Sequence, residues 1–457
     1  MDTPPEPRND ERSVPRRLFD LALPVIGLNI LGVLALVVDT AMCGRLPNHE
    51  DALNALGFAT QVVFLAMVGM MGLIVGTVAF VARAHGAKDE KQVNHILWQS
   101  TQLTVLVSFA VAALGNAFAP ALLRLLGADD SVLELCLDYL RPNLSFSLFF
   151  YLSMLYAAVL RGVGNTRLPF LVGLFSNALN FVFNYGLILG NFGLPQLGVQ
   201  GAAIGTVASQ ACGVILLVAL LKRGAVPGID LKIGLKRIDA ALSKRLAVVG
   251  APAALDMIVL NAGFASIVGM LGHMDAVAVA AHGVGIRIQS LAFMPGFGVS
   301  QATGAMVGNA LGASDAARAR SVARAAMVLC TLLMTVIAGV LLIGAPQLVG
   351  IFEIPAGTRL ADLSVMWIRI LGFGIPIVGV HIAIIGVLRG SGATRTSLRI
   401  NIVGTCIQIP LSYVLGVTMG LGPWGVWAGF PISFVFKAIL GIAAYLKGDW
   451  AKTGRRV

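Results

Sequence analysis

The stretch VLRGVGNTR, residues 159–167, returns almost unchanged as VLRGSGATR at residues 387–395, a shift of 228 positions. A second pair of stretches, AHGAKD at 84–89 and ALGASD at 310–315, repeats with a shift of 226. A near-constant shift at separate landmarks indicates two homologous halves rather than chance similarity. The fold is therefore expected to consist of two copies of one unit.

The composition places these halves in a membrane. Of the 457 residues, 57% are hydrophobic and 12% are charged, whereas a soluble domain carries about 25% charged residues. A membrane span needs about 20 mostly apolar residues. We therefore predict an all-α polytopic membrane protein with about 12 transmembrane helices in two pseudo-symmetric six-helix lobes. The expected spans are 21–44, 53–82, 96–118, 132–160, 168–190, 198–221, 246–271, 276–310, 323–344, 360–388, 397–418 and 424–446.

The basic residues predict the topology. Of the 33 Lys and Arg residues, 26 fall on one side of these spans and only three on the other. Positive loops stay in the cytoplasm, so both termini are expected there, in a multi-pass protein of a bacterial inner membrane. Each half then enters from the same side, which makes the repeat parallel. The net charge of +11 is a topology signal, and we expect no nucleic-acid partner.

The same pattern predicts five regions. Residues 1–17 are expected to form a disordered cytoplasmic tail, and 18–221 the first lobe. A cytoplasmic linker is expected at 222–245, followed by the second lobe at 246–446 and a cytoplasmic tail at 447–457.

A carboxylate interrupts the first span. Asp39 is the only charged side chain between Leu21 and Gly44. An ionisable group at membrane depth is costly and is a functional-site hypothesis by default. The alternative is that Asp39 only bridges helices through hydrogen bonds.

Several polar side chains are expected at about the same depth as Asp39. Asn177, Asn180 and Asn184 follow one face of the fifth span, and Thr206 lies in the sixth. Carboxylate, amide and hydroxyl oxygens are the ligands that a small hard cation prefers. We predict a proton or cation site at Asp39, Asn180, Asn184 and Thr206, with Na⁺ as the candidate metal. For Asn177, a purely structural hydrogen bond is the alternative.

Two opposite charges are expected near the middle of the second lobe. Asp256 lies in the seventh span and Arg287 in the eighth, so a salt bridge between them is predicted. The alternative is a role in binding substrate or a proton. Together with Asn177 and Gln61, they form the predicted substrate or second-lobe polar site.

These residues resemble a known family. Pro24, VVDTAMCGRL at 37–46 and the paired VLRGxGxTR motifs are similar to MATE (multidrug and toxic compound extrusion) transporters. PAALD at 252–256 and the long stretch AHGVGIRIQS…NALGASD at 281–315 resemble the DinF-like branch most closely. The resemblance covers nearly the whole chain.

The resemblance implies an antiporter that expels amphipathic organic cations and drugs in exchange for H⁺ or Na⁺. It implies coupling roles for an acid at Asp39, an amide at Asn180 and a hydroxyl at Thr206. The family's second acid in this site is replaced here by Asn184, which leaves open whether Na⁺ or only a proton binds. Asp256 stands where many relatives have Glu. We expect a monomer surrounded by membrane lipids, with no cofactor besides the coupling ion.

Other functions were weighed against this one. A lipid-linked oligosaccharide or lipid flippase of the same superfamily would need a basic cavity and about fourteen helices, whereas most basic residues here lie outside the spans. An enzyme is disfavoured because the sequence has no HExxH, Walker A or GxSxG motif. A passive channel is disfavoured because cation channels surround their pore with a ring of acidic side chains, whereas Asp39 is a single acid in one lobe.

Overall fold

The computed structural model describes residues 13–231 and 237–452, and every regular element in those residues is helical. The helices are α1 (Val14–Cys43), α2 (His49–Gly86), α3 (Glu90–Ala110), η1 (Val111–Gly115), α4 (Asn116–Leu125), α5 (Asp130–Ser145), α6 (Ser147–Gly162), α7 (Arg167–Leu189), α8 (Gly198–Lys222), α9 (Ala240–Gly272), α10 (Ala276–Gly312), α11 (Ala316–Gly350), α12 (Arg359–Gly390), α13 (Thr394–Tyr413), η2 (Val414–Thr418), α14 (Gly422–Lys447) and α15 (Asp449–Lys452).

The span count agrees with the sequence. Eleven helical stretches in the described residues are long and apolar enough to cross a membrane. The pair α5 and α6, bent by 53° at Phe146, makes a twelfth. The bend was not predicted from sequence. The equivalent helix of the second half, α12, contains Pro376 but continues as one helix.

The predicted region boundaries shift by a few residues. Helix α1 begins at Val14, so residues 14–17 are helical and not part of a disordered tail. The linker ends earlier than predicted, because Asp239 caps α9, which begins at Ala240. Residues 1–12, 232–236 and 453–457 lie outside the described residues, so the structure does not test the rest of the predicted tails.

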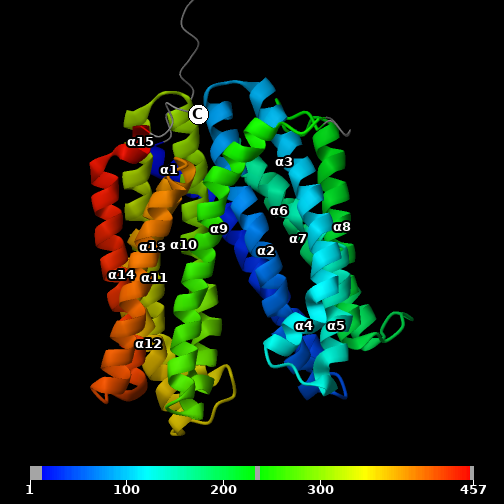
Figure 1. The fold of residues 1–457 in the computed structure, drawn as a ribbon, viewed down its shortest axis with the longest axis vertical. Helices are drawn as coiled ribbons and strands as arrows, with labels where there is room; N and C mark the ends of the chain where they lie inside the picture. Colours follow the sequence, from blue (N-terminus) through cyan, green and yellow to red (C-terminus); the bar gives the residue numbers. More distant parts are fainter. Residues whose placement is uncertain (1–12, 232–236, 453–457) are drawn as a thin grey trace, which may run out of the picture.

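The two lobes stand side by side (Figure 1), and each completes the hydrophobic core of the other. Leu18 and Ala22, in the first turns of α1, are buried in the core of the second lobe. Leu242 and Leu246, in the first turns of α9, are buried in the core of the first lobe. Because α1 and α9 are equivalent in the repeat, the exchange follows the symmetry of the two halves. Accordingly α1 packs against α10, and α2 against α9.

The exchange lies at one end of the bundle, which we call the terminal face because α1 begins and α14 ends there (Figure 1). The other end is called the opposite face. Near the terminal face, α2 and α9 cross at Gly72 and Gly250. A Cβ on Gly72 would lie 2.7 Å from the carbonyl oxygen of Gly250. Only glycine permits this crossing.

A pair of symmetric hydrogen bonds also joins the lobes at the terminal face. Arg83 of α2 donates to the carbonyl oxygen of Ser391, just after α12. Its counterpart at the 226 shift, Asn309 of α10, donates to the carbonyl oxygen of Gly162 at 2.9 Å. Each bond runs from one half to a VLRG motif of the other half, either at its last residue, Gly162, or at the next residue, Ser391. The lobes are therefore closed against each other at this face.

Candidate ion-coupling site

Asp39 lies on α1 and is buried where this helix packs against α7. It lies four residues before the end of α1 at Cys43, and its side chain is 5% exposed. The amide Nδ2 of Asn184 donates to the Asp39 carboxylate at 2.5 Å. Asn184 itself is fully buried. In the described residues no basic side chain pairs with Asp39, and the two side chains that hydrogen-bond to it, Asn184 and Thr206, are neutral.

The other two predicted members of this site form a pair beside it. Asn180 donates through Nδ2 to the hydroxyl of Thr206 at 3.1 Å, which joins α7 to α8. Gly205 makes room for Asn184, because a Cβ at position 205 would overlap the Asn184 Oδ1 atom. The structure thus brings together Asp39, Asn180, Asn184 and Thr206 as predicted on three packed helices.

Two other predicted residues form no side-chain hydrogen bond with this group in the described part of the chain. Asn177 donates to the carbonyl of Gly173 within its own helix at 2.8 Å, which matches the structural alternative for this residue. Gln61 is exposed on α2 and has no side-chain hydrogen bond to the site. The predicted role of Asn177 and Gln61 in a substrate or second-lobe polar site with Asp256 and Arg287 stays a prediction.

The predicted salt bridge between Asp256 and Arg287 is wrong. The Asp256 carboxylate is fully buried and pairs with Arg389 of α12 at 2.9 Å. It also accepts hydrogen bonds from Ser397 at 2.8 Å and Asn401 at 2.5 Å. Arg287 is exposed. The sequence places Arg389 just after the expected span 360–388, whereas in the structure it lies in the last turn of α12.

The spacing between acid and amide residues in the sequence could have identified a partner of Asp256. Asn184 lies 145 residues after Asp39, and Asn401 lies 145 residues after Asp256. The same acid-to-amide spacing therefore occurs in both halves, although it does not follow the 228-residue repeat. Ser397 is one helical turn before Asn401 and faces the same carboxylate.

The orientation of the Asn184 amide bears on which ion could bind at Asp39. The Asn184 amide presents its nitrogen to Asp39, and its Oδ1 is buried without a hydrogen-bond partner. Na⁺ is a hard cation that needs oxygen ligands. A Na⁺ ion held by the Asn184 oxygen would need this amide to turn the other way.

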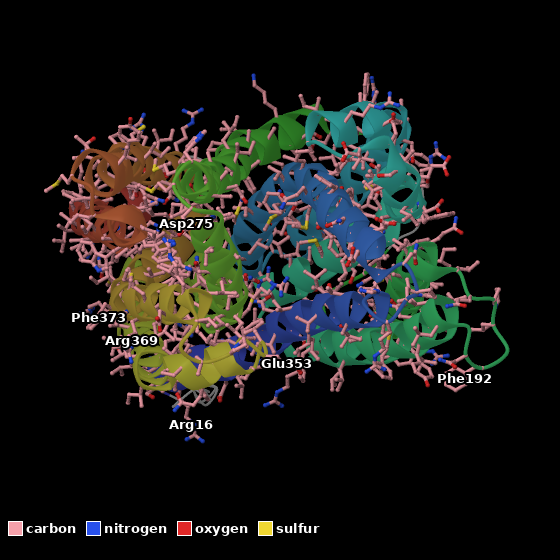
Figure 2. All side chains as sticks on the ribbon, turned by 90° about the horizontal axis from the view of Figure 1, so that it is seen from below. Arg16, Phe192, Asp275, Glu353, Arg369 and Phe373 are labelled. Atoms are coloured by element: carbon pink, nitrogen blue, oxygen red, sulfur yellow. The ribbon has the colours of Figure 1, made fainter. Side chains whose placement is uncertain are left out.

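A cleft of about 880 Å³ lies elsewhere, between α11, α12 and α14. Arg369 and Phe373 line it. The view onto the opposite face shows both residues at the outer rim of the second lobe, away from the first lobe (Figure 2). None of the residues around Asp39 or Asp256 lines this cleft, so its position argues against a role in transport between the lobes.

Comparisons with known proteins agree with the repeat and the fold. "Probable multidrug resistance protein NorM" of Thermotoga maritima is 29% identical over 450 residues, covering 98% of this chain and 95% of that protein. "Multidrug resistance protein NorM" of Burkholderia vietnamiensis is 28% identical, covering 92% and 91%. A solved structure described as "Outward-facing conformation of a multidrug resistance MATE family transporter of the MOP superfamily" is 20% identical, with a TM-score of 0.89 and 98% of both chains covered.

The family model described as MatE matches the chain twice, at residues 24–186 and 252–414. The two matches are offset by 228 positions, which is the repeat shift found in the sequence. They span more than half of the chain and include Asp39, Asn184 and Asp256. The membership indicates a membrane transporter rather than an enzyme, with small molecules as its substrates. The chain is a member of the MatE family.

Proposed function

We propose that the protein exports amphipathic organic cations, drugs among them, by antiport with H⁺ bound at Asp39. The observation that carries the proposal is the burial of the Asp39 carboxylate, 5% exposed, with a neutral amide and no cation as its partner. An ionised Asp at membrane depth costs about 3 kcal/mol on insertion scales. A protonated carboxyl avoids that cost. Burial of Asp39 therefore favours proton binding, and a state that exposes Asp39 to water favours proton release. The family membership and the names of the relatives support drug export.

The proposed mechanism is alternating access. The named contacts between the lobes, including Gly72 with Gly250 and the bonds of Arg83 and Asn309, lie near the terminal face. With the terminal face in the cytoplasm, as the basic residues predict, this state is closed to the cytoplasm. Export requires a second state in which these contacts separate. A proton and a drug then exchange because each binds the two states with different affinity.

The flippase alternative is less well supported. It predicts about fourteen helices, whereas the described residues provide up to twelve spans. The relatives compared above are named for multidrug resistance and not for lipid transfer.

The test is ethidium uptake into inverted membrane vesicles that contain the protein, driven in separate experiments by a pH gradient and by a Na⁺ gradient. We expect the pH gradient to drive uptake, and Asp39→Asn to reduce it to the level of empty vesicles. The matched control is Asp51→Asn, because Asp51 is an exposed acid in the first turn of α2. This variant should transport like the wild type.

Each outcome has a clear meaning. Full-rate uptake by Asp39→Asn would refute the coupling role of Asp39. Uptake driven only by the Na⁺ gradient would replace H⁺ by Na⁺ as the coupling ion. If neither gradient moves ethidium, and the protein instead moves a lipid-linked oligosaccharide between leaflets, the flippase alternative is correct.

A further inference from the structure

An unpaired arginine lies where the two lobes meet at the terminal face. Arg161, in the last turn of α6, is the repeat counterpart of Arg389. Arg389 is neutralised by Asp256, but the position equivalent to Asp256 in the first half is Leu28. Within the described residues Arg161 has no ion-pair partner, and its buried Nε–H donates no hydrogen bond. Arg161 is partly buried, and a partly buried charge without a partner is unfavourable, so we expect an anion to neutralise it.

Arg161 lines a cleft that can admit such an anion. The cleft has a volume of about 510 Å³ and is formed by both halves of the chain. Lys88 and His85 line it from the first half, and Arg318 lines it from the second. Glu90 is its one acidic lining residue. The excess of positive charge favours an anion with several acceptor oxygens, because arginine binds phosphate through paired N–H donors.

The cleft continues toward the edge of the bundle. A neighbouring cleft of about 680 Å³ shares Arg17, Leu21 and His85 with it and reaches the start of α7. There it is lined by Leu168 and by Leu171, whose side chain is 59% exposed. Basic groups inside and the exposed Leu171 at the edge suit a phospholipid whose phosphate enters the cleft while its acyl chain stays outside.

We propose that this cleft binds a phosphate group, carried by an anionic lipid or free in solution, which neutralises Arg161. The bound phosphate lies between groups of the first half, Arg161 and Lys88, and Arg318 of the second half. Separating the lobes at the terminal face would pull these groups apart. Phosphate binding therefore stabilises the state in which this face is closed. The site is distinct from the proposed ion-coupling site, so it can be tested by binding even if the transport proposal fails.

The experiment has two arms, both on the full-length purified protein. In the first arm, inorganic phosphate is titrated into delipidated protein in a zwitterionic detergent, and the thermal midpoint of unfolding is recorded. In the second arm, the protein is placed in nanodiscs of equal parts phosphatidylglycerol and phosphatidylcholine. Native mass spectrometry then counts the lipids that stay bound. The variant is Arg161→Gln, and the matched control is Arg223→Gln, an exposed arginine that lines neither cleft.

We expect saturable binding that Arg161→Gln weakens at least tenfold, because a charge-assisted hydrogen bond contributes about 1.5–3 kcal/mol. Arg223→Gln should bind like the wild type. Selective loss of phosphatidylglycerol in the second arm identifies a lipid, and loss in the first arm alone identifies a free anion. Unchanged binding in both arms overturns the proposal. If Arg161→Gln does not fold, the same two measurements are made on Arg318→Gln, whose exposed position should tolerate the change. Unchanged phosphate and lipid binding by that variant would also overturn the proposal.

Discussion

The two halves each bury one acid–amide pair between equivalent helices, but at different depths. Asp39 and Asn184 join α1 to α7, and Asp256 and Asn401 join α9 to α13. The acids are 217 positions apart, whereas the repeat shift is 228. Asp256 is thus 11 residues closer to the terminal face than a strict copy of Asp39 would be. At 1.5 Å per residue this is about 16 Å along the helix.

The pairs also differ in charge. Asp256 has Arg389 as a counterion at 2.9 Å, so the group around it is neutral when both are ionised. Asp39 has no such partner, and its charge can be removed only by a proton or an added cation. The comparison teaches that similar hydrogen-bond geometry can support two roles. The pair in the second lobe holds helices together, and the pair in the first lobe is suited to exchange an ion.

Breaking the pair in the second lobe should give the largest effect on stability. Asp256→Asn leaves the half-buried Arg389 guanidinium without a counterion, and we expect the free energy of unfolding to fall by about 3–5 kcal/mol. Asp39→Asn removes a charge that has no counterion, so it should leave stability nearly unchanged. The measurement is denaturant unfolding of both variants in the same detergent.

The double variant Asp256→Asn with Arg389→Gln provides the control for this prediction. It leaves no unpaired charge and should recover a large part of the loss. Equal losses in Asp39→Asn and Asp256→Asn would show that the two acids do not differ in the way described.

Adding a second acid should change the ion that the first lobe binds. In the wild type, the side chains of Asn184 and Asp39 are 2.5 Å apart at their hydrogen bond. Asn184→Asp would therefore place two carboxylates next to each other. Both can be ionised only if a cation lies between them. We expect Na⁺ to stimulate ethidium transport by this variant severalfold, with little effect on the wild type. Asn401→Asp is the matched change, because the positive charges of Arg389 and of the buried Lys437 near Asp256 can balance two carboxylates without Na⁺. Equal Na⁺ dependence of both variants would contradict the comparison.

A smaller effect is expected from moving Asn184 without changing its chemistry. The Cβ added by Gly205→Ala overlaps the Asn184 Oδ1 atom, so the amide must shift away from its position beside Asp39. Loss of a hydrogen bond to a charged group corresponds to about a tenfold change. We expect ethidium transport to fall by about that factor with the protein still folded. Gly57→Ala, which meets no atom within 4 Å, is the control and should transport normally.

The smallest effect is expected at Asp239, which caps α9 outside the spans. The N–H of Leu242 donates to this carboxylate at 3.0 Å and His95 contacts it at 3.1 Å, and these interactions lower the pKa of Asp239 below its ordinary value of 3.8. A lowered pKa stabilises the folded protein above pH 4, and the contribution is lost as the pH falls through the folded-state pKa. The thermal midpoint of Asp239→Asn should lie slightly below that of the wild type at pH 7, and the gap should close below pH 4. A gap that widens on acidification would refute this assignment.

Much of this architecture could be predicted from the sequence. Span length, the repeat of VLRGVGNTR and the isolated charge of Asp39 can be read from the sequence pattern. The count of up to twelve spans was confirmed. Asp39 contacts Asn184, and the role of this group in ion coupling stays a prediction. The partner of Asp256 could not be predicted, because helix ends shift by several residues and Arg389 was assigned to a loop. Depth along a span also does not say which face of a helix a side chain occupies. Arg287 matched Asp256 in depth but is exposed.

The exchange of first helices between the lobes bears on how the protein is made. The first six spans leave the ribosome before α9, yet Leu242 and Leu246 of α9 complete the core of the first lobe. An isolated fragment ending at Lys222 would therefore contain an unfilled core, much as a domain-swapped dimer does when one protomer is missing. The arrangement is the one expected if a half-length ancestor paired with a second copy by exchanging its first helix before the two were joined. Fragments 1–222 and 223–457 should then assemble when they are produced together, and neither should fold alone.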